Sequence, residues 1–248
     1  FPSVRDSFVY RVSAATLTSR DYRVEALVAP RVRRIDVQYA YPAFTGLAPR
    51  VEEDGGDIYG PAGTEVRLLV HTDKAIAEGT LVLSDGRRVG LEGTGAGPFT
   101  ATFPIETDGS YTVAVTDIDG LSNPGNTAYF IRTTFDLVPE VAVLRPWGDR
   151  EITPLEEVTI EVRAEDDYRV GALELVYAVV GRREQSMAFE TPARAQTVTG
   201  RHTLYAEDLG VAPGDFITYY ARARDVGYGG QSREARSDIF FLEIRPFD

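Results

Sequence analysis

The side chains best suited to chemistry are carboxylates at the ends of two predicted strands. Asp166 and Asp167 directly follow one of these strands, and Asp225 is the last residue of another. If the loops of a β-sandwich bring the three carboxylates to one end, they form the all-oxygen site that Ca²⁺ prefers. Aspartate also caps turns by accepting hydrogen bonds from backbone N–H groups, which accounts for the same residues without a metal. The pattern favours turn capping and leaves a calcium site as the alternative.

A second group of candidates is aromatic. Tyr39, Tyr41 and Phe44 place three rings within six residues, around Pro42. Rings on the rim of a fold can stack on sugars or seat a protein partner. They can equally pack a first strand onto its own domain. The sequence favours packing, with a glycan or protein contact as the alternative.

Alternation along a late segment gives a third group. Tyr220, Arg222 and Arg224 share one face of a predicted strand, whereas Ile217 and Tyr219 lie on the opposite, core-facing side. Tyrosine and arginine are enriched among interface hot spots. The stripe is therefore a candidate partner contact, although a face covered by a neighbouring unit carries the same residue types.

No constellation typical of an enzyme is found. The sequence has no phosphate-binding Gly-Lys-Ser/Thr loop, no His-Glu-x-x-His and no Gly-x-Ser-x-Gly. The absence of cysteine excludes thiolate zinc sites and cysteine nucleophiles. His71 and His202 have no identifiable partner. We therefore expect a non-enzyme with no cofactor other than the calcium alternative, and the formal charge of −12 argues against nucleic acid.

Short alternating segments separated by turn residues predict stacked antiparallel sheets. A tyrosine precedes an aspartate by six residues twice, at Tyr111 and Asp117 and again at Tyr219 and Asp225. This repetition indicates two related units. By analogy with the corner tyrosine of immunoglobulin domains, we expect both tyrosines to be anchored through their hydroxyls.

The predicted fold class is all-β, with tandem immunoglobulin-like or fibronectin-III-like β-sandwiches. Complete sandwiches are expected at 30–135 and 136–248, and residues 1–29 are expected to be the C-terminal strands of a preceding unit. Pro30 and Pro139 mark the joints, which lack Gly/Ser linkers. Short joints of this kind predict a stiff rod.

An ordered set of phrases also resembles a known family. The phrases are Tyr39-Ala-Tyr-Pro-Ala-Phe-Thr-Gly-Leu47, Gly63-Thr-Glu-Val66, His71-Thr-Asp-Lys74, Ala164-Glu-Asp-Asp-Tyr168, and the segments 213–225 and 237–247. They resemble the extracytoplasmic segment of a bacterial family described only as a domain of unknown function. Its members look like large membrane-anchored proteins with tandem immunoglobulin-like domains. The resemblance implies the periplasmic side of the inner membrane, with attachment through segments outside residues 1–248, and it carries over no catalytic residue.

The expected function follows from the repeated sandwiches, the missing catalytic motifs and this resemblance. We expect a non-catalytic array that serves as a spacer or a protein-interaction module, with an unidentified protein partner. One alternative is a glycan- or peptidoglycan-binding module that uses the aromatic stretch around Tyr41 and Phe44. The other is a set of accessory domains of a larger enzyme.

Overall fold

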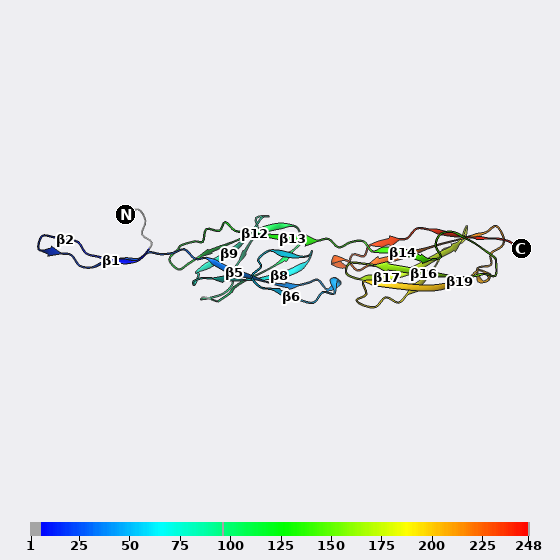
Figure 1. Cartoon of the computed structure of the whole chain (residues 1–248), viewed down its shortest axis with the longest axis horizontal. Coiled ribbons are helices and arrows are strands. Elements are labelled where there is room, and N and C mark those ends of the chain that lie inside the picture. The colour runs from blue at the N-terminus through cyan, green and yellow to red at the C-terminus, as the bar shows by residue number, and fades with distance from the viewer. Residues whose placement is uncertain (1–5, 96, 248) are drawn as a thin grey trace.

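The structure is a computed structural model that describes residues 6–95 and 97–247. Three units follow one another along the long axis of the molecule (Figure 1). An N-terminal hairpin comes first, then a first sandwich from Val32 to Thr134 and a second sandwich from Glu140 to Ile244. The fold is all-β with two tandem sandwiches, as the alternating pattern predicts.

The N-terminal hairpin consists of β1 (Phe8–Tyr10), β2 (Ser13–Ala14), β3 (Leu17–Thr18) and β4 (Tyr22–Val24). Strands β1 and β4 pair antiparallel, and the rings of Tyr10 and Tyr22 stack with centroids 5.4 Å apart. Leu17 at the tip is 78% exposed. Two-stranded hairpins are marginally stable by themselves. Residues 1–5 lie outside the described residues, and the assignment of 1–29 to a preceding sandwich stays a prediction.

The first sandwich packs a four-stranded sheet, in the order β11-β8-β5-β6, against a five-stranded sheet, in the order β10-β9-β12-β13-β7. Strand β7 pairs parallel with β13 over four residue pairs, and the other pairs are antiparallel. The strands are β5 (Val32–Ala40), β6 (Arg50–Glu52), β7 (Ile58–Pro61), β8 (Thr64–Thr72), β9 (Glu78–Leu83), β10 (Arg88–Gly90), β11 (Phe99–Ile105), β12 (Gly109–Thr116) and β13 (Ala128–Thr134), with a 3₁₀ turn at Ala43–Thr45.

The second sandwich repeats this plan. A sheet in the order β14-β16-β19 faces a sheet in the order β15-β22-β20-β17-β18, and β21 adds to β20. Strand β15 pairs parallel with β22 over three residue pairs. The strands are β14 (Glu140–Arg145), β15 (Arg150–Ile152), β16 (Glu157–Glu165), β17 (Val170–Val179), β18 (Gln185–Phe189), β19 (Thr197–Tyr205), β20 (Phe216–Asp225), β21 (Glu234–Arg236) and β22 (Phe240–Ile244), with 3₁₀ turns at Glu207–Leu209 and Tyr228–Gly230.

Each sandwich has its own hydrophobic core, built by strict alternation along its strands. In β8, Val66, Leu68 and Val70 are fully buried, and in β20 so are Ile217 and Tyr219. Each such side chain contributes about 1.5–3 kcal/mol on burial. The first core draws on residues from 35 to 131 and the second on residues from 152 to 244. The two cores share no residue, so each sandwich is a folding unit with its own apolar interior.

The two repeated tyrosines both lie in these cores, but only one is anchored by its hydroxyl. Tyr111 donates a hydrogen bond of 2.5 Å to the carbonyl oxygen of Gly56. The hydroxyl of Tyr219 is buried with no hydrogen-bond partner among the described residues. Burial raises the pKa of Tyr219 to about 12. The expected anchoring is therefore confirmed for Tyr111 and wrong for Tyr219, whose ring is held by packing alone.

Candidate functional site: the joints between the units

The two sandwiches meet in an aromatic contact. The ring of Phe44, in the first sandwich, packs edge-on against Tyr168 of the second, with centroids 5.4 Å apart, and lies 6.3 Å from Tyr228. Tyr228 also approaches the turn between β7 and β8, where a Cβ on Gly63 would lie only 2.1 Å from its ring. Glycine at this position is what allows the second sandwich to come so close.

At the same joint, an arginine fixes the linker that joins the two sandwiches. Asp225, at the end of β20, is 2% exposed. Its carboxylate accepts hydrogen bonds from the side chain of Arg233 at 2.7 and 2.9 Å. The same guanidinium donates to two linker carbonyls, that of Asp136 at 2.5 Å and that of Leu137 at 2.8 Å. Arg233 therefore ties the linker to a buried charge of the second sandwich.

The linker carries one more carboxylate beside Arg233. The Asp136 side chain lies 2.7 Å from the guanidinium. Burial raises the pKa of Asp136 above its ordinary value, and this effect outweighs the opposing effect of the Arg233 charge. On the other side, Leu137 N–H donates to Asp167 at 3.3 Å. The linker is thus held through both its carbonyl and its amide groups.

The joint before the first sandwich has the same construction with a different cation. Asp117, 2% exposed, lies six residues after Tyr111 and pairs with the ammonium of Lys74 at 2.5 Å. Lys74 also donates to the carbonyl of Val28 at 2.5 Å. The Lys74 ammonium beside the Asp117 carboxylate holds the pKa of Asp117 below its ordinary value. The first joint is therefore tied to its sandwich in the same way as the second.

The Lys74 and Arg233 arrangements bind their linkers at equivalent positions of the chain. Val28 lies two residues before Pro30, and Leu137 lies two residues before Pro139. We call this arrangement the linker clamp: a buried aspartate, a cation paired with it, and a linker carbonyl bound by the same cation. The sequence pattern singles out the aspartates but not the cations. Lys74 had one available signal, since it is the only lysine in the chain.

This network binds most oxygens of the predicted calcium ligands, although Oδ2 of Asp166 is buried without a hydrogen-bond partner among the described residues. Asp166 accepts hydrogen bonds from the backbone N–H of Tyr168 and of Arg169, at 3.0 and 2.5 Å. Asp167 and Asp225 bind the linker and Arg233, as described above. Within residues 6–95 and 97–247, no group of three or more acidic, histidine or cysteine side chains is placed to hold a metal ion. Calcium binding stays a prediction, open to a comparison of melting temperatures with Ca²⁺ and with a chelator.

The aromatic candidates Tyr39, Tyr41 and Phe44 all pack against other residues of the protein. Tyr39 is 2% exposed and stacks on Tyr41, with centroids 5.8 Å apart and planes 7° apart. Tyr41 packs against the first core. Phe44 lies in the joint between the sandwiches, as described above. Because Tyr39 is buried, its ring cannot stack on a sugar. Tyr41 and Phe44 are partly exposed, and a glycan or partner contact through them stays a prediction.

The Tyr220–Arg224 stripe lies on the outer face of β20, but partners from its own sheet hold it. Tyr220 is 5% exposed, because β21 lies beside it and Arg236 places its guanidinium 5.5 Å from the ring centroid. Arg222 pairs with Glu174 at 2.5 Å, and Arg224 pairs with Glu234 at 3.0 Å. Tyr220 is therefore too buried for a partner contact, whereas a contact through Arg222 or Arg224 stays a prediction.

Of the two histidines, His71 has a partner that sequence reasoning missed. Its Nε2 lies 2.9 Å from a carboxylate oxygen of Asp36, which also binds Arg34 at 3.1 Å. The other carboxylate oxygen of Asp36 accepts the backbone N–H of Asp54. Asp36 thereby fixes the loop after β6. His202 stacks on Tyr177, with ring centroids 6.1 Å apart.

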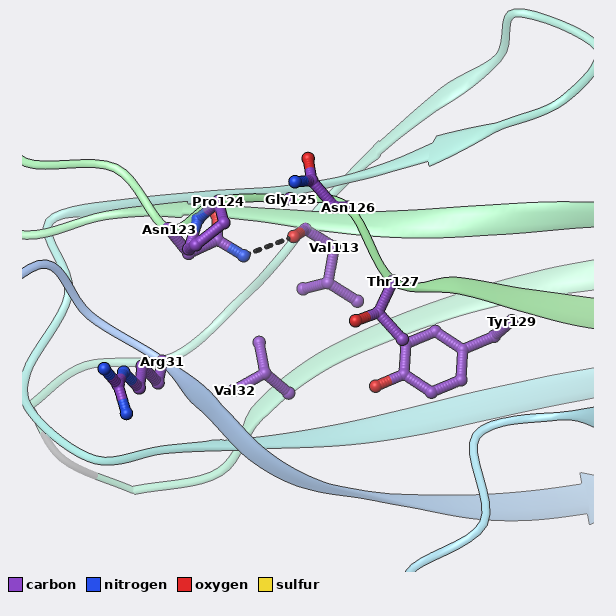
Figure 2. Close-up of a pocket in the computed structure, with 9 residues that line it drawn as sticks. All are labelled: Arg31, Val32, Val113, Asn123, Pro124, Gly125, Asn126, Thr127 and Tyr129. Atoms are coloured by element: carbon purple, nitrogen blue, oxygen red, sulfur yellow. Dashed lines mark hydrogen bonds between the residues drawn. The ribbon is translucent and has the colours of Figure 1, made fainter.

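An open cavity of about 320 Å³ lies at the hairpin end of the first sandwich (Figure 2). Asn123 lines it, donating to the carbonyl of Val113 and accepting from the N–H of Val115. The Asn123 amide therefore takes the place of a strand partner for β12. Among the described residues, Arg31 is the only charged residue that lines the cavity. With Asn123 committed to the backbone, the other polar side chains of the lining are Asn126, Thr127 and Tyr129.

Comparisons with known proteins give fold neighbours only. No protein-family model matches the chain, and no curated protein matches it. Similar solved structures include fibronectin(III)-like modules of Clostridium thermocellum CbhA, at 12% identity, 77% of this chain, 90% of that chain and a TM-score of 0.27. The DIP-gamma IG1+IG2 structure is 10% identical, covers 76% of this chain and 94% of its own, and has a TM-score of 0.28. An ICAM-5 D1-D4 ectodomain fragment is 18% identical, covers 78% of this chain and 50% of its own, and has a TM-score of 0.33. These TM-scores are too low to carry an argument about function.

Among the described residues, no helix is long and apolar enough to cross a membrane.

Proposed function

We propose that this chain is a stiff, non-catalytic β-sandwich spacer that holds whatever flanks it at a fixed separation and orientation. The observation that carries the proposal is the linker clamp, which occurs at both joints. A linker held only by its covalent bonds leaves neighbouring domains free to move. Here a carbonyl of each linker accepts a hydrogen bond from a cation, and that cation pairs with a buried aspartate of the sandwich that follows.

Two further contacts support a fixed joint between the sandwiches. Phe44 packs against Tyr168, and Thr134 lies in hydrogen-bond distance of the Tyr168 hydroxyl at 3.2 Å. An aromatic contact resists bending toward one side, whereas Arg233 resists separation of the linker. Together they restrain the joint from two directions.

For the setting, we propose the outer side of a bacterial inner membrane, with attachment through segments outside residues 1–248. The resemblance of the ordered phrases to a membrane-anchored family supports this location. Protease accessibility in spheroplasts tests it. We expect the protein to pellet with membranes and its sandwiches to be cut from outside. A protected protein would overturn the location but not the stiffness.

Stiffness can be measured directly because the chain has no cysteine. A cysteine pair at the exposed positions Thr102 and Thr199 puts one spin label on each sandwich. We expect the distance distribution to be about as narrow as that of a control pair within the first sandwich, Thr102 and Ala114. A distribution several times broader than the control's would contradict the spacer proposal, since flexibly joined sandwiches sample many separations.

A further inference from the structure

One large aromatic side chain stands out from the second sandwich. Trp147, between β14 and β15, is 89% exposed and is the only tryptophan in the chain. Tryptophan is highly buried on average in folded proteins. Packing within the second sandwich therefore does not explain this ring, and no repeating sequence pattern marks it. Its Pro146-Trp147-Gly148 setting between Arg145 and Arg150 was the available signal.

Trp147 borders an open, polar depression of about 560 Å³. We call it the Trp147 site; its lining residues are Arg145, Pro146, Trp147, Arg150, Thr159, Glu161 and Arg201. Thr159 and Glu161 lie on β16, and Arg201 lies opposite Glu161 on β19. The side chains therefore project from the outer face of the sheet rather than from its edge.

The charge of the Trp147 site is opposite to that of the chain. Three arginines and one glutamate line it, whereas the whole chain has a formal charge of −12. Glu161 is shared, since it lies 2.6 Å from Arg201 and 3.8 Å from Arg145. Arg150 pairs with Glu156 at 3.1 Å. Each guanidinium has five N–H donors, so these two carboxylates leave most of the donors free. The site is suited to an anion that brings further carboxylate oxygens.

We propose that the Trp147 site binds a carboxylate-bearing glycan. The indole face would stack on the apolar C–H face of a sugar ring, which is an apolar surface with polar edges. Arg201 and Arg145 would bind the sugar carboxylate in the bidentate geometry that guanidinium favours. The glycan alternative considered from the sequence thus moves from Tyr41 to Trp147. This inference is independent of the spacer function.

An acidic peptide is the competing ligand, and the geometry favours it less. A peptide that adds a strand binds backbone groups at a sheet edge, whereas these side chains stand on the sheet face. A peptide anchor residue needs an enclosed apolar pocket. Here Pro146 and Trp147 supply the apolar lining, and the rest is arginine, glutamate and threonine. Such a surface fits a flat polar ring with a negative charge.

Because Trp147 is the only tryptophan, its fluorescence reports on this site alone. The test is a titration of the full chain with tetragalacturonate, next to its methyl ester and to tetraglutamate. We expect a saturable change with tetragalacturonate and at least about tenfold weaker binding of the other two. No saturable change at millimolar tetragalacturonate overturns the proposal. Equal binding of the ester removes the carboxylate from recognition, and equal binding of tetraglutamate makes the site an acidic-peptide site; either result overturns it.

Variants locate the binding on the surface. Arg201→Gln, followed by fluorescence, and Trp147→Ala, followed by calorimetry, should each weaken binding about tenfold or more. Both side chains are largely exposed, so we expect the melting temperatures to stay near that of the parent chain. Arg224→Gln, on the opposite sheet, is the matched control and should bind as the parent does. Equal loss in the control variant would show a general charge effect and overturn the site.

Discussion

Replacing Tyr219 with alanine is expected to lower the free energy of unfolding of the second sandwich by about 3–5 kcal/mol. The ring is fully buried among Ile217, Ala221 and the strands of the facing sheet, and it packs against Phe240 with centroids 5.7 Å apart. Truncation would leave a cavity that rigid strands cannot close. Denaturant unfolding measures the effect, and a loss below about 1 kcal/mol would place the ring outside the core.

Removal of the hydroxyl alone should affect stability differently at Tyr219 and at Tyr111. Tyr219→Phe should be neutral or slightly stabilising, because its buried hydroxyl has no partner among the described residues. Tyr111→Phe should cost about 1–2 kcal/mol, because it removes the hydrogen bond to Gly56 and leaves that carbonyl unpaired. Equal effects at the two positions would contradict the difference in anchoring.

Arg233→Gln is expected to cost about 2–3 kcal/mol of stability and to broaden the distance distribution between labels on the two sandwiches. The substitution leaves Asp225 buried without its cation, which in a fully buried pair costs about 3–5 kcal/mol. Arg233 itself is 35% exposed, so solvent reduces the loss. Two linker carbonyls also lose a donor.

The matched control for the linker clamp is Arg245→Gln. Arg245 pairs with Glu151 and Glu243, and its side chain is half-exposed. We expect a stability close to that of the parent chain and an unchanged distance distribution, because solvent screens exposed ion pairs. A double-mutant cycle with Asp225→Asn isolates the pair, because the two losses should not add if both break one interaction. Additive losses, or an unchanged distribution in Arg233→Gln, would contradict the linker clamp.

The sequence predicts the strands and their faces well, because burial on a sheet has a period of two. The assignment of Ile217 and Tyr219 to the core follows from this period alone. What alternation cannot provide is the identity of partners across long separations. Arg233 and Leu137 lie 96 positions apart, and Lys74 and Val28 lie 46 apart. The aspartates were therefore recognisable as turn residues, whereas their cations were not.

The aromatic stretch shows the same limit. Three rings around Pro42 can cover their own sandwich, a neighbour or a ligand, and local sequence treats these outcomes alike. In the structure Tyr39 joins its own core, whereas Phe44 reaches the next sandwich. Local sequence does not mark Trp147 either, because a single aromatic residue forms no repeating pattern. Its significance comes from the arginines that the fold brings beside it from β19 as well as from its own segment.

The parallel pairing of β7 with β13, and of β15 with β22, decides how the molecule responds to a pulling force. The chain enters each sandwich at one end and leaves at the other, so tension along the long axis draws the last strand past its parallel neighbour (Figure 1). The ladder hydrogen bonds then share the load in shear instead of opening one after another. Each last strand also pairs antiparallel with its other neighbour over four residue pairs, so the sandwiches differ in the parallel ladder. That ladder has four residue pairs in the first sandwich and three in the second, so the second sandwich should yield first under tension.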